Sequence, residues 1–163
     1  MSNARDLSDN RKLTSGTTQA TTSGTVRDFT GIPSWATRIT VVFDSVSTNG
    51  SSAFAVQVGS GSVQTTGYSS GLWSGTATNI TANTGFIASV SNASFGFSGA
   101  MVLHLVGANT WLATCLSTVV TTNNIGYQSV GRVTLSGALD RVRFTTFNGT
   151  DAFDAGSINI LYE

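Results

Sequence analysis

The sequence predicts an all-β protein, namely an antiparallel, jelly-roll-like β-sandwich preceded by an extended N-terminal arm. The 163-residue chain contains one Glu, one Lys and little Leu, so residues that commonly build helices are scarce. Apolar residues instead alternate with polar ones over short stretches, and turn signals rich in Gly and Asn separate these stretches. Nine Phe, three Trp and three Tyr supply large side chains for a core, although only 10% of the residues are charged.

Residues 1–25 form the predicted arm, and residues 26–163 form the predicted sandwich domain. Five charged residues lie between Arg5 and Lys12, and the residues that follow are almost all small and polar. Such a segment has too little apolar surface to fold alone. Because free termini usually fray, we expect a partner subunit to order this arm, by attachment or by exchange between subunits.

The first predicted strands lie at residues 38–44 and 52–58, where apolar side chains recur at every second position. Pro33 precedes them and fits a strand entrance, since it cannot donate a backbone hydrogen bond. Asn49-Gly50 between the two stretches is a strong signal for a tight turn with positive φ at both positions. The two stretches therefore predict a β-hairpin.

The rest of the chain continues as strands and turns. The glycine-rich stretch 59–75 predicts a loop, whereas the apolar run 100–106 is typical of a strand that is covered on both faces. Residues 107–110 predict a turn, and Asn148-Gly149 predicts another. The later strands are predicted at residues 86–90, 100–106, 111–120, 125–135, 139–147 and 157–162.

Residue types that carry catalysis are scarce, which favours a non-enzymatic protein. A Ser-His-Asp triad needs a histidine, and the single one, His104, lies in an apolar stretch where a structural or interface role is expected. One His and one Cys (Cys115) cannot form a zinc site or an intrachain disulfide. We therefore expect no metal site and no cofactor.

Asp151 and Asp154 form a local acidic pair, but their spacing does not match a calcium-binding loop. We expect a polar turn in which these carboxylates accept hydrogen bonds from nearby backbone amides. The seven Asp residues and Glu163 could still converge in space as the two carboxylates of a glycosidase, and the sequence leaves this alternative open.

The predicted partners follow from charge and from aromatic residues. A net charge of zero argues against nucleic acid, and neither a membrane span nor a signal peptide is expected. Tyr68 and Trp73 are the candidate ligand-binding residues, because flat rings beside neutral polar groups suit a glycan or a subunit interface. Trp35 and Trp111 flank predicted strands and are expected in the core.

Three stretches carry a resemblance to a known family. They are residues 28–43 (DFTGIPSWATRITVVF), residues 46–51 (VSTNGS) and residues 153–163 (FDAGSINILYE). In these stretches the chain resembles a module found in tail-fibre and other virion appendage proteins of tailed bacteriophages. The resemblance implies a β-sandwich, a homotrimer located in the virion, and no catalytic residue.

The length of the chain fits one module of this kind with a short arm rather than a long fibre. It would then be a short tail fibre, a tail-tip protein or a capsid decoration (cement) protein, attached to other virion proteins through the arm. Its outer loops could contact a glycan on the host surface. A polysaccharide-degrading tailspike and a free-standing carbohydrate-binding lectin are the alternatives from other classes.

Overall fold

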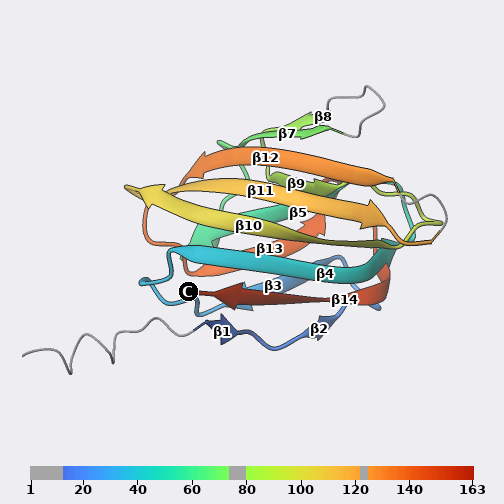
Figure 1. The fold of residues 1–163 in the computed structure, drawn as a ribbon, viewed down its shortest axis with the longest axis horizontal. Helices are drawn as coiled ribbons and strands as arrows, with labels where there is room; N and C mark the ends of the chain where they lie inside the picture. The colour runs from blue at the N-terminus through green and yellow to red at the C-terminus, as the bar shows by residue number, and fades with distance from the viewer. Residues whose placement is uncertain (1–12, 74–79, 122–124) are drawn as a thin grey trace, which may run out of the picture.

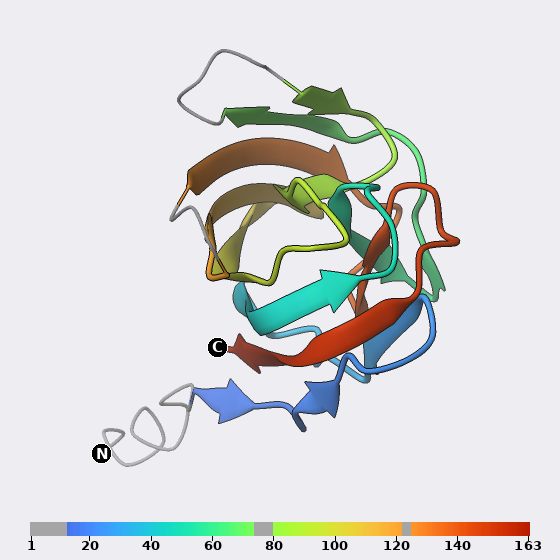
Figure 2. The same cartoon turned by 90° about the vertical axis from the view of Figure 1, so that its right-hand side faces the viewer.

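The computed structural model describes residues 13–73, 80–121 and 125–163, which form two antiparallel β-sheets packed face to face (Figure 1). No helix occurs in these described ranges. The predicted all-β sandwich is therefore confirmed. Figure 2 shows the two layers from the side, with the chain curving around the space between them.

Among the described residues, the larger sheet has nine strands and the smaller sheet has five. The strands of the larger sheet are β1 (Thr14–Ser15), β2 (Gln19–Ala20), β4 (Arg38–Thr48), β7 (Ser69–Trp73), β8 (Ile80–Ala82), β10 (Phe97–Gly107), β11 (Thr110–Val119), β12 (Gly126–Thr134) and β14 (Phe153–Tyr162). The strands of the smaller sheet are β3 (Val26–Thr30), β5 (Phe54–Ser60), β6 (Ser62–Val63), β9 (Phe86–Ser89) and β13 (Arg141–Thr146). Neighbours in the larger sheet follow the order β1-β14-β4-β10-β11-β12-β7-β8, with β2 also on β14. The smaller sheet has the order β3-β13-β5-β6, and β9 also pairs with β5.

The core lies between the sheets and is built from alternate residues of the strands. In β4, Ile39 and Phe43 are buried, whereas the residues next to them in the chain are only partly buried or exposed. From the other strands, Phe54, Phe144 and Phe153 stack on one another with ring centroids 5.5–6.3 Å apart. Burial of each such side chain stabilises the fold by roughly 1.5–3 kcal/mol, so this aromatic cluster holds the two sheets together.

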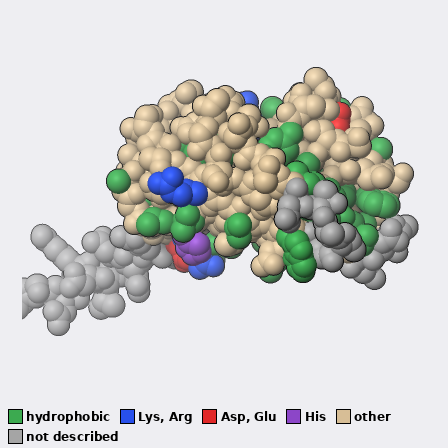
Figure 3. Space-filling model, turned by 90° about the horizontal axis from the view of Figure 1, so that it is seen from above, with side chains coloured by type: hydrophobic (Ala, Val, Ile, Leu, Met, Phe, Trp, Pro, Cys, Tyr) green, Lys and Arg blue, Asp and Glu red, His purple; other side chains and the backbone are tan. Residues whose placement is uncertain are grey.

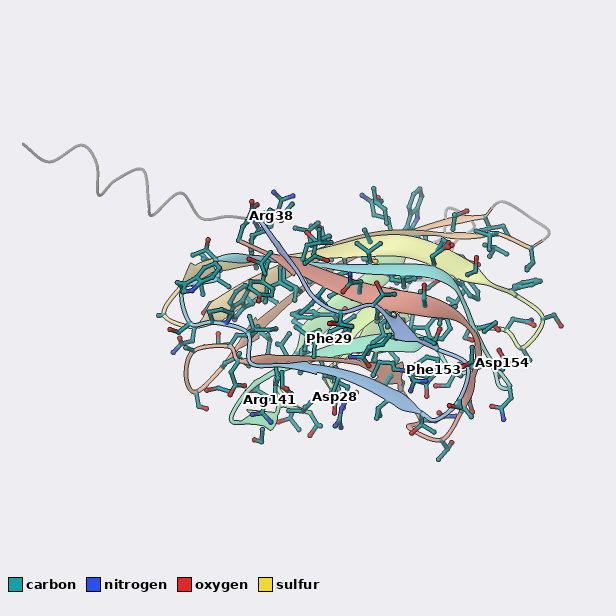
Figure 4. All side chains as sticks on the ribbon, turned by 90° about the horizontal axis from the view of Figure 1, so that it is seen from below. Asp28, Phe29, Arg38, Arg141, Phe153 and Asp154 are labelled. Carbon is teal, nitrogen blue, oxygen red and sulfur yellow. The ribbon has the colours of Figure 1, made fainter. Side chains whose placement is uncertain are left out.

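The charged residues lie on the outsides of the two sheets. Arg38 and Asp28 occupy opposite outer faces of the sandwich, with Phe153 between the layers (Figure 4). Asp28 forms a bidentate pair with Arg143 of the neighbouring strand, with both N···O distances at 2.7 Å. The core itself is therefore uncharged in the described residues.

The predicted hairpin at Asn49-Gly50 is wrong, because β4 and β5 lie in different sheets. Neither residue has a positive φ, so the tight turn that this dipeptide favours does not form. The carboxylate of Asp151 instead occupies the space that a Cβ on Gly50 would need. The glycine is thus required for close packing and not for a turn.

Two connections carry the chain between the sheets, residues 49–53 from β4 to β5 and residues 147–152 from β13 to β14. We call them the crossing connections, and they are hydrogen-bonded to each other. The amide of Asn49 donates to the carbonyl of Ala152 (3.0 Å), and the amide of Ala152 donates to Oδ1 of Asn49 (2.9 Å). Gly149 has a φ of 68°, so the predicted second turn is confirmed. The two crossings are thereby fixed as one unit.

The described part of the predicted arm belongs to the larger sheet and is not a free segment. Figure 2 shows β1 and β2 running along β14. Thr14 is in register with Tyr162, and Ala20 with Ser157. Backbone hydrogen bonds to a strand edge need no apolar side chains, so this polar segment can pair with β14 of its own chain. Residues 1–12 of the predicted arm lie outside the described residues.

The other predicted strands and turns lie where the structure has them, but their first and last residues differ by up to four positions. Residues 59–73, the described part of the predicted loop, contain β6 and β7. The turn between β10 and β11 is confirmed, since Ala108 and Asn109 both have positive φ values, 46° and 59°. β10 and β14 begin three and four residues earlier than expected, at Phe97 and Phe153.

Candidate functional site

The larger sheet exposes big apolar side chains on the side that points away from the core. On β11, Leu112 is 43% exposed and Leu116 is 66% exposed. On β12, Val130 is 58% exposed and is in register with Thr114 of β11. Val102 of β10 is in register with Thr114 from the other side. We call this surface the outer face and define it by Val102, Leu112, Thr114, Leu116 and Val130.

Charged residues border the outer face but do not interrupt it. At one end, His104 is in register with both Leu112 and Arg38, and Arg38 binds Glu163 with an N···O distance of 2.9 Å. Arg132 also lies in register with Leu112. The histidine is exposed at this border, which fits the expected interface role better than a catalytic one.

A sequence signal for the outer face exists in β11. Trp111, Ala113 and Cys115 alternate with Leu112 and Leu116, so the strand is apolar on both sides. The same is true of the run 100–106, which is typical of a strand covered on both faces. In the described chain only the inner side of these strands is covered by the second sheet, so the outer side is left available to a partner.

A groove lies at the β7–β8 edge of the same sheet, and we call it the edge groove. Trp73 of β7 is 56% exposed there and is in register with Gln128 of β12. Hydrophobic side chains gather over this edge in the view from above (Figure 3). The edge groove has a volume of about 350 Å³. Its lining consists of Gly71, Leu72, Trp73, Ile80, Thr81, Gln128, Ser129 and Val130.

The structure separates the two predicted ligand-binding residues. Trp73 is exposed as expected, although it lies at the end of a strand and not in a loop. Tyr68 is buried, with 4% of its surface exposed, and packs edge-on against Phe86 at 4.9 Å between centroids. Tyr68 therefore offers no ring face to a ligand, and its proposed binding role is corrected.

The hydroxyl of Tyr68 has a structural function instead. It accepts a hydrogen bond from the amide of Val58 (2.8 Å) and lies within donating distance of the carbonyl of Gln64 (3.0 Å). Burial raises the pKa of Tyr68 to about 12, so the hydroxyl stays protonated and holds the β5–β6 turn. No local pattern indicates these backbone partners, because the hydroxyl finds them only after the chain folds back on itself.

Of the other two tryptophans, one is buried and one is exposed. Trp111 is buried as expected, with 2% of its surface exposed. Trp35 was expected in the core but is 44% exposed and lies beside Tyr162, with ring centroids 5.9 Å apart. Its ring packs on Tyr162 of β14 at the surface and not in the interior.

Each described carboxylate serves as a hydrogen-bond acceptor within the fold. Asp28, Asp140 and Glu163 pair with arginines. Asp44 accepts from Ser98 at 2.7 Å, and Asp154 accepts from Ser47. Such carboxylates are typical of structural positions, as expected for most of them from their places at turns or beside Arg.

Asp151 lies at the crossing connections, and the polar turn predicted for it and Asp154 is found only in part, because the local amides of Thr150 and Asp151 donate to Oδ1 of Asn148 and Asp154 accepts from the hydroxyl of Ser47. The carboxylate of Asp151 accepts hydrogen bonds from the side chain of Asn148 (2.6 Å) and from the amide of Ser52 (2.9 Å). These two bonds, the one from Asn148 first, lower the pKa of Asp151 below its usual value. Across residues 13–73, 80–121 and 125–163, no group of three potential metal ligands is found.

Cys115 is buried in the core beneath the outer face. Its thiol donates to the carbonyl of Ala88 at 3.3 Å. Burial raises the pKa of Cys115 to about 12, so the reactive thiolate is not formed near neutral pH. The residue acts as a small apolar side chain.

Comparison with known proteins adds no relative. No model of a known protein family matches the chain, and a search of the curated proteins found no match. A search of the described residues also found no helix long and apolar enough to cross a membrane. The outer face and the edge groove are therefore the features on which a function can be argued.

Proposed function

We propose that the chain is a non-enzymatic structural protein of a bacteriophage virion and that its copies assemble into a trimer through the outer face. The phage assignment rests on the resemblance of residues 28–43, 46–51 and 153–163 to virion appendage modules. The assembly rests on one observation, the uncovered apolar surface around Leu116.

An apolar surface on regular strands is well suited to association between copies. Interface centres are depleted of charge and rich in apolar side chains, and charge collects at the rim. The outer face has this arrangement, since Leu112, Leu116 and Val130 lie inside a border that includes Arg38 and Arg132. The described carboxylates are held in hydrogen bonds of the fold, which supports a role outside catalysis.

The oligomeric state tests the assembly. The full chain is expected to have the mass of a trimer in light scattering coupled to size exclusion, and Leu116→Asp is expected to reduce it to a monomer. Burying an unpaired carboxylate at an interface costs several kcal/mol, which exceeds what a small interface can lose. Val26→Asp is the matched control, because Val26 is 37% exposed on the smaller sheet. A monomeric parent chain, or a trimeric Leu116→Asp variant, would contradict the proposal.

The place in the virion requires a second measurement. Quantitative mass spectrometry of purified phage particles that carry this chain counts its copies per particle. Hundreds of copies would indicate capsid decoration, whereas a few copies would indicate a short tail fibre or tail tip. Absence of the chain from the particles would contradict a virion role altogether.

A further inference from the structure

The edge groove is built around a position that lacks a side chain. Gly71 of β7 is in register with Val130 of β12 on one side and with Thr81 of β8 on the other. Residues in register point to the same side of a sheet, so Val130 and Thr81 form two walls with the glycine between them. Trp73, two residues further along β7, points to the same side and closes the groove at that end.

The hollow at Gly71 is open and is not taken up by the fold. A Cβ placed on Gly71 would meet a single atom within 4 Å, the carbonyl oxygen of Ile80 at 3.9 Å. Gly99 of β10 differs, because a Cβ there would lie only 2.4 Å from the carbonyl oxygen of Leu116 and 2.8 Å from the Cα of Ser117, which are backbone atoms that it cannot displace. Gly71 is therefore not needed for packing, and its effect is to leave space on the surface.

The chemistry around this space suits one class of ligand. The lining offers an exposed indole from Trp73, an amide from Gln128 and a hydroxyl from Thr81, and none of the lining residues is charged. A sugar ring has a C–H face that packs on an aromatic ring and hydroxyls that exchange hydrogen bonds with amides and hydroxyls. A volume of about 350 Å³ lies at the lower end of small-ligand sites, which fits one or two sugar rings.

We propose that the edge groove binds a neutral saccharide, with the Trp73 indole against the ring and Gln128 and Thr81 on its hydroxyls. A charged sugar is disfavoured, because the lining supplies no opposite charge to compensate for its desolvation. This role goes beyond the proposed assembly. The groove shares Val130 with the outer face. Its other lining residues lie on β7, β8 and β12, whereas Leu112 and Leu116 lie on β11, so each surface can be changed through residues that the other does not contain.

The test measures binding of the full chain to an array of neutral oligosaccharides of bacterial polysaccharides, with acidic oligosaccharides included. Gly71→Val fills the groove without strain, since Gly71 has no positive φ and open space at its Cβ. Gly126→Val is the matched control, because Gly126 lies on β12 with nothing within 4 Å of its Cβ and does not line the groove. We expect Gly71→Val to weaken binding at least tenfold and Gly126→Val to leave it unchanged.

A second pair of variants tests the indole. Trp73→Ala is expected to abolish saccharide binding, whereas Trp35→Ala removes another exposed tryptophan and is expected to leave binding intact. No binding to any neutral oligosaccharide, or binding of acidic ones alone, would overturn the proposal. So would a trimer that dissociates on Gly71→Val, because the groove would then be part of the interface between copies. Loss of the trimer in Leu116→Asp alone bears on the assembly and not on the groove.

Discussion

The two edges of the larger sheet are built in opposite ways. At one edge, β14 is covered by β1 and β2, and the amide of Gly16 donates to the carbonyl of Ile160 at 2.8 Å. At the other edge, the three-residue strand β8 lies beside β7, and the edge groove lies over β7 between β12 and β8. The covered edge is closed by the chain itself, while the open edge presents the groove with the Trp73 indole in its lining. Ligand contact is therefore expected at the open edge.

Glycine has a different function at each edge. Gly156 in β14 has a φ of 92°, and a Cβ there would lie 2.5 Å from the carbonyl oxygen of Ser45. It allows the bulge at which β14 bends against β4. Gly71 in β7 has neither constraint. The same residue type thus serves backbone geometry at one edge and surface shape at the other, and substitution can distinguish the two.

The largest effect is expected for Gly156→Ala at the covered edge. The positive φ and the contact with a backbone oxygen together are expected to reduce the free energy of unfolding by about 3 kcal/mol or more. Urea denaturation measures this change. A loss below about 1 kcal/mol would mean that the bulge relaxes freely and that the two glycines do not differ in kind.

The next effect is expected for Thr21, which anchors the segment after β2 to the covered edge. Its side chain is fully buried and donates to the carbonyl of Ala155 at 2.7 Å. Thr21→Val keeps the shape but removes the hydrogen bond to that carbonyl, so we expect a loss of about 1–3 kcal/mol in unfolding free energy. Thr21→Ser keeps the hydroxyl and is expected to lose less. Equal losses in the two variants would show that the hydroxyl does not hold the edge.

A smaller, pH-dependent effect is expected for Asp151, at the entry to β14. Folding lowers the pKa of Asp151 below its ordinary value of 3.8. The ionised carboxylate therefore stabilises the protein at a pH above that value, and this contribution is lost as the pH falls through the pKa of the folded state. Asp151→Asn is therefore expected to be less stable than the parent chain near pH 7, with the difference shrinking between about pH 5 and pH 2. Thermal unfolding across this range measures it. A stability difference between the two proteins that stays constant with pH would contradict a stabilising role of the ionised Asp151 carboxylate.

The smallest effect is expected for Gly71→Ala at the open edge. With open space and no positive φ, the free energy of unfolding should change by about 0.5 kcal/mol or less. The same urea experiment gives the comparison with Gly156→Ala. A loss as large as that at Gly156 would mean that the edge groove is part of the packed fold.

Strand positions were predictable from the sequence, but strand partners were not. Alternation in residues 38–44 and the turn at 107–110 depend on neighbours in the chain, and both were confirmed. Asn49-Gly50 favours a hairpin locally, yet β4 pairs with β10 and β14, which are distant in sequence. Pairing of this kind depends on the packing of the whole sandwich, so a local signal is overruled.

The candidate sites were predictable only in part for a related reason. The exposure of Trp73 followed from its glycine-rich surroundings, and Gly71 beside it proves to be what shapes the groove. The burial of Tyr68 depends on the carbonyls of Val58 and Gln64 meeting its hydroxyl, which no local pattern reveals. The apolar run 100–106 indicated a strand covered on both faces, but its outer side is uncovered in the described chain, which is a property of the folded sheet.

The place of β14 in the larger sheet has a consequence for the order in which the protein can form. This strand follows all the others along the chain, yet it lies between β1 and β4, which are made early in synthesis. While the ribosome is still adding residues before Phe153, one side of β4 has no partner and the segment before β3 has no strand to join. Closure of the sheet therefore has to wait until translation has passed β14, and nascent copies expose an unpaired strand until then.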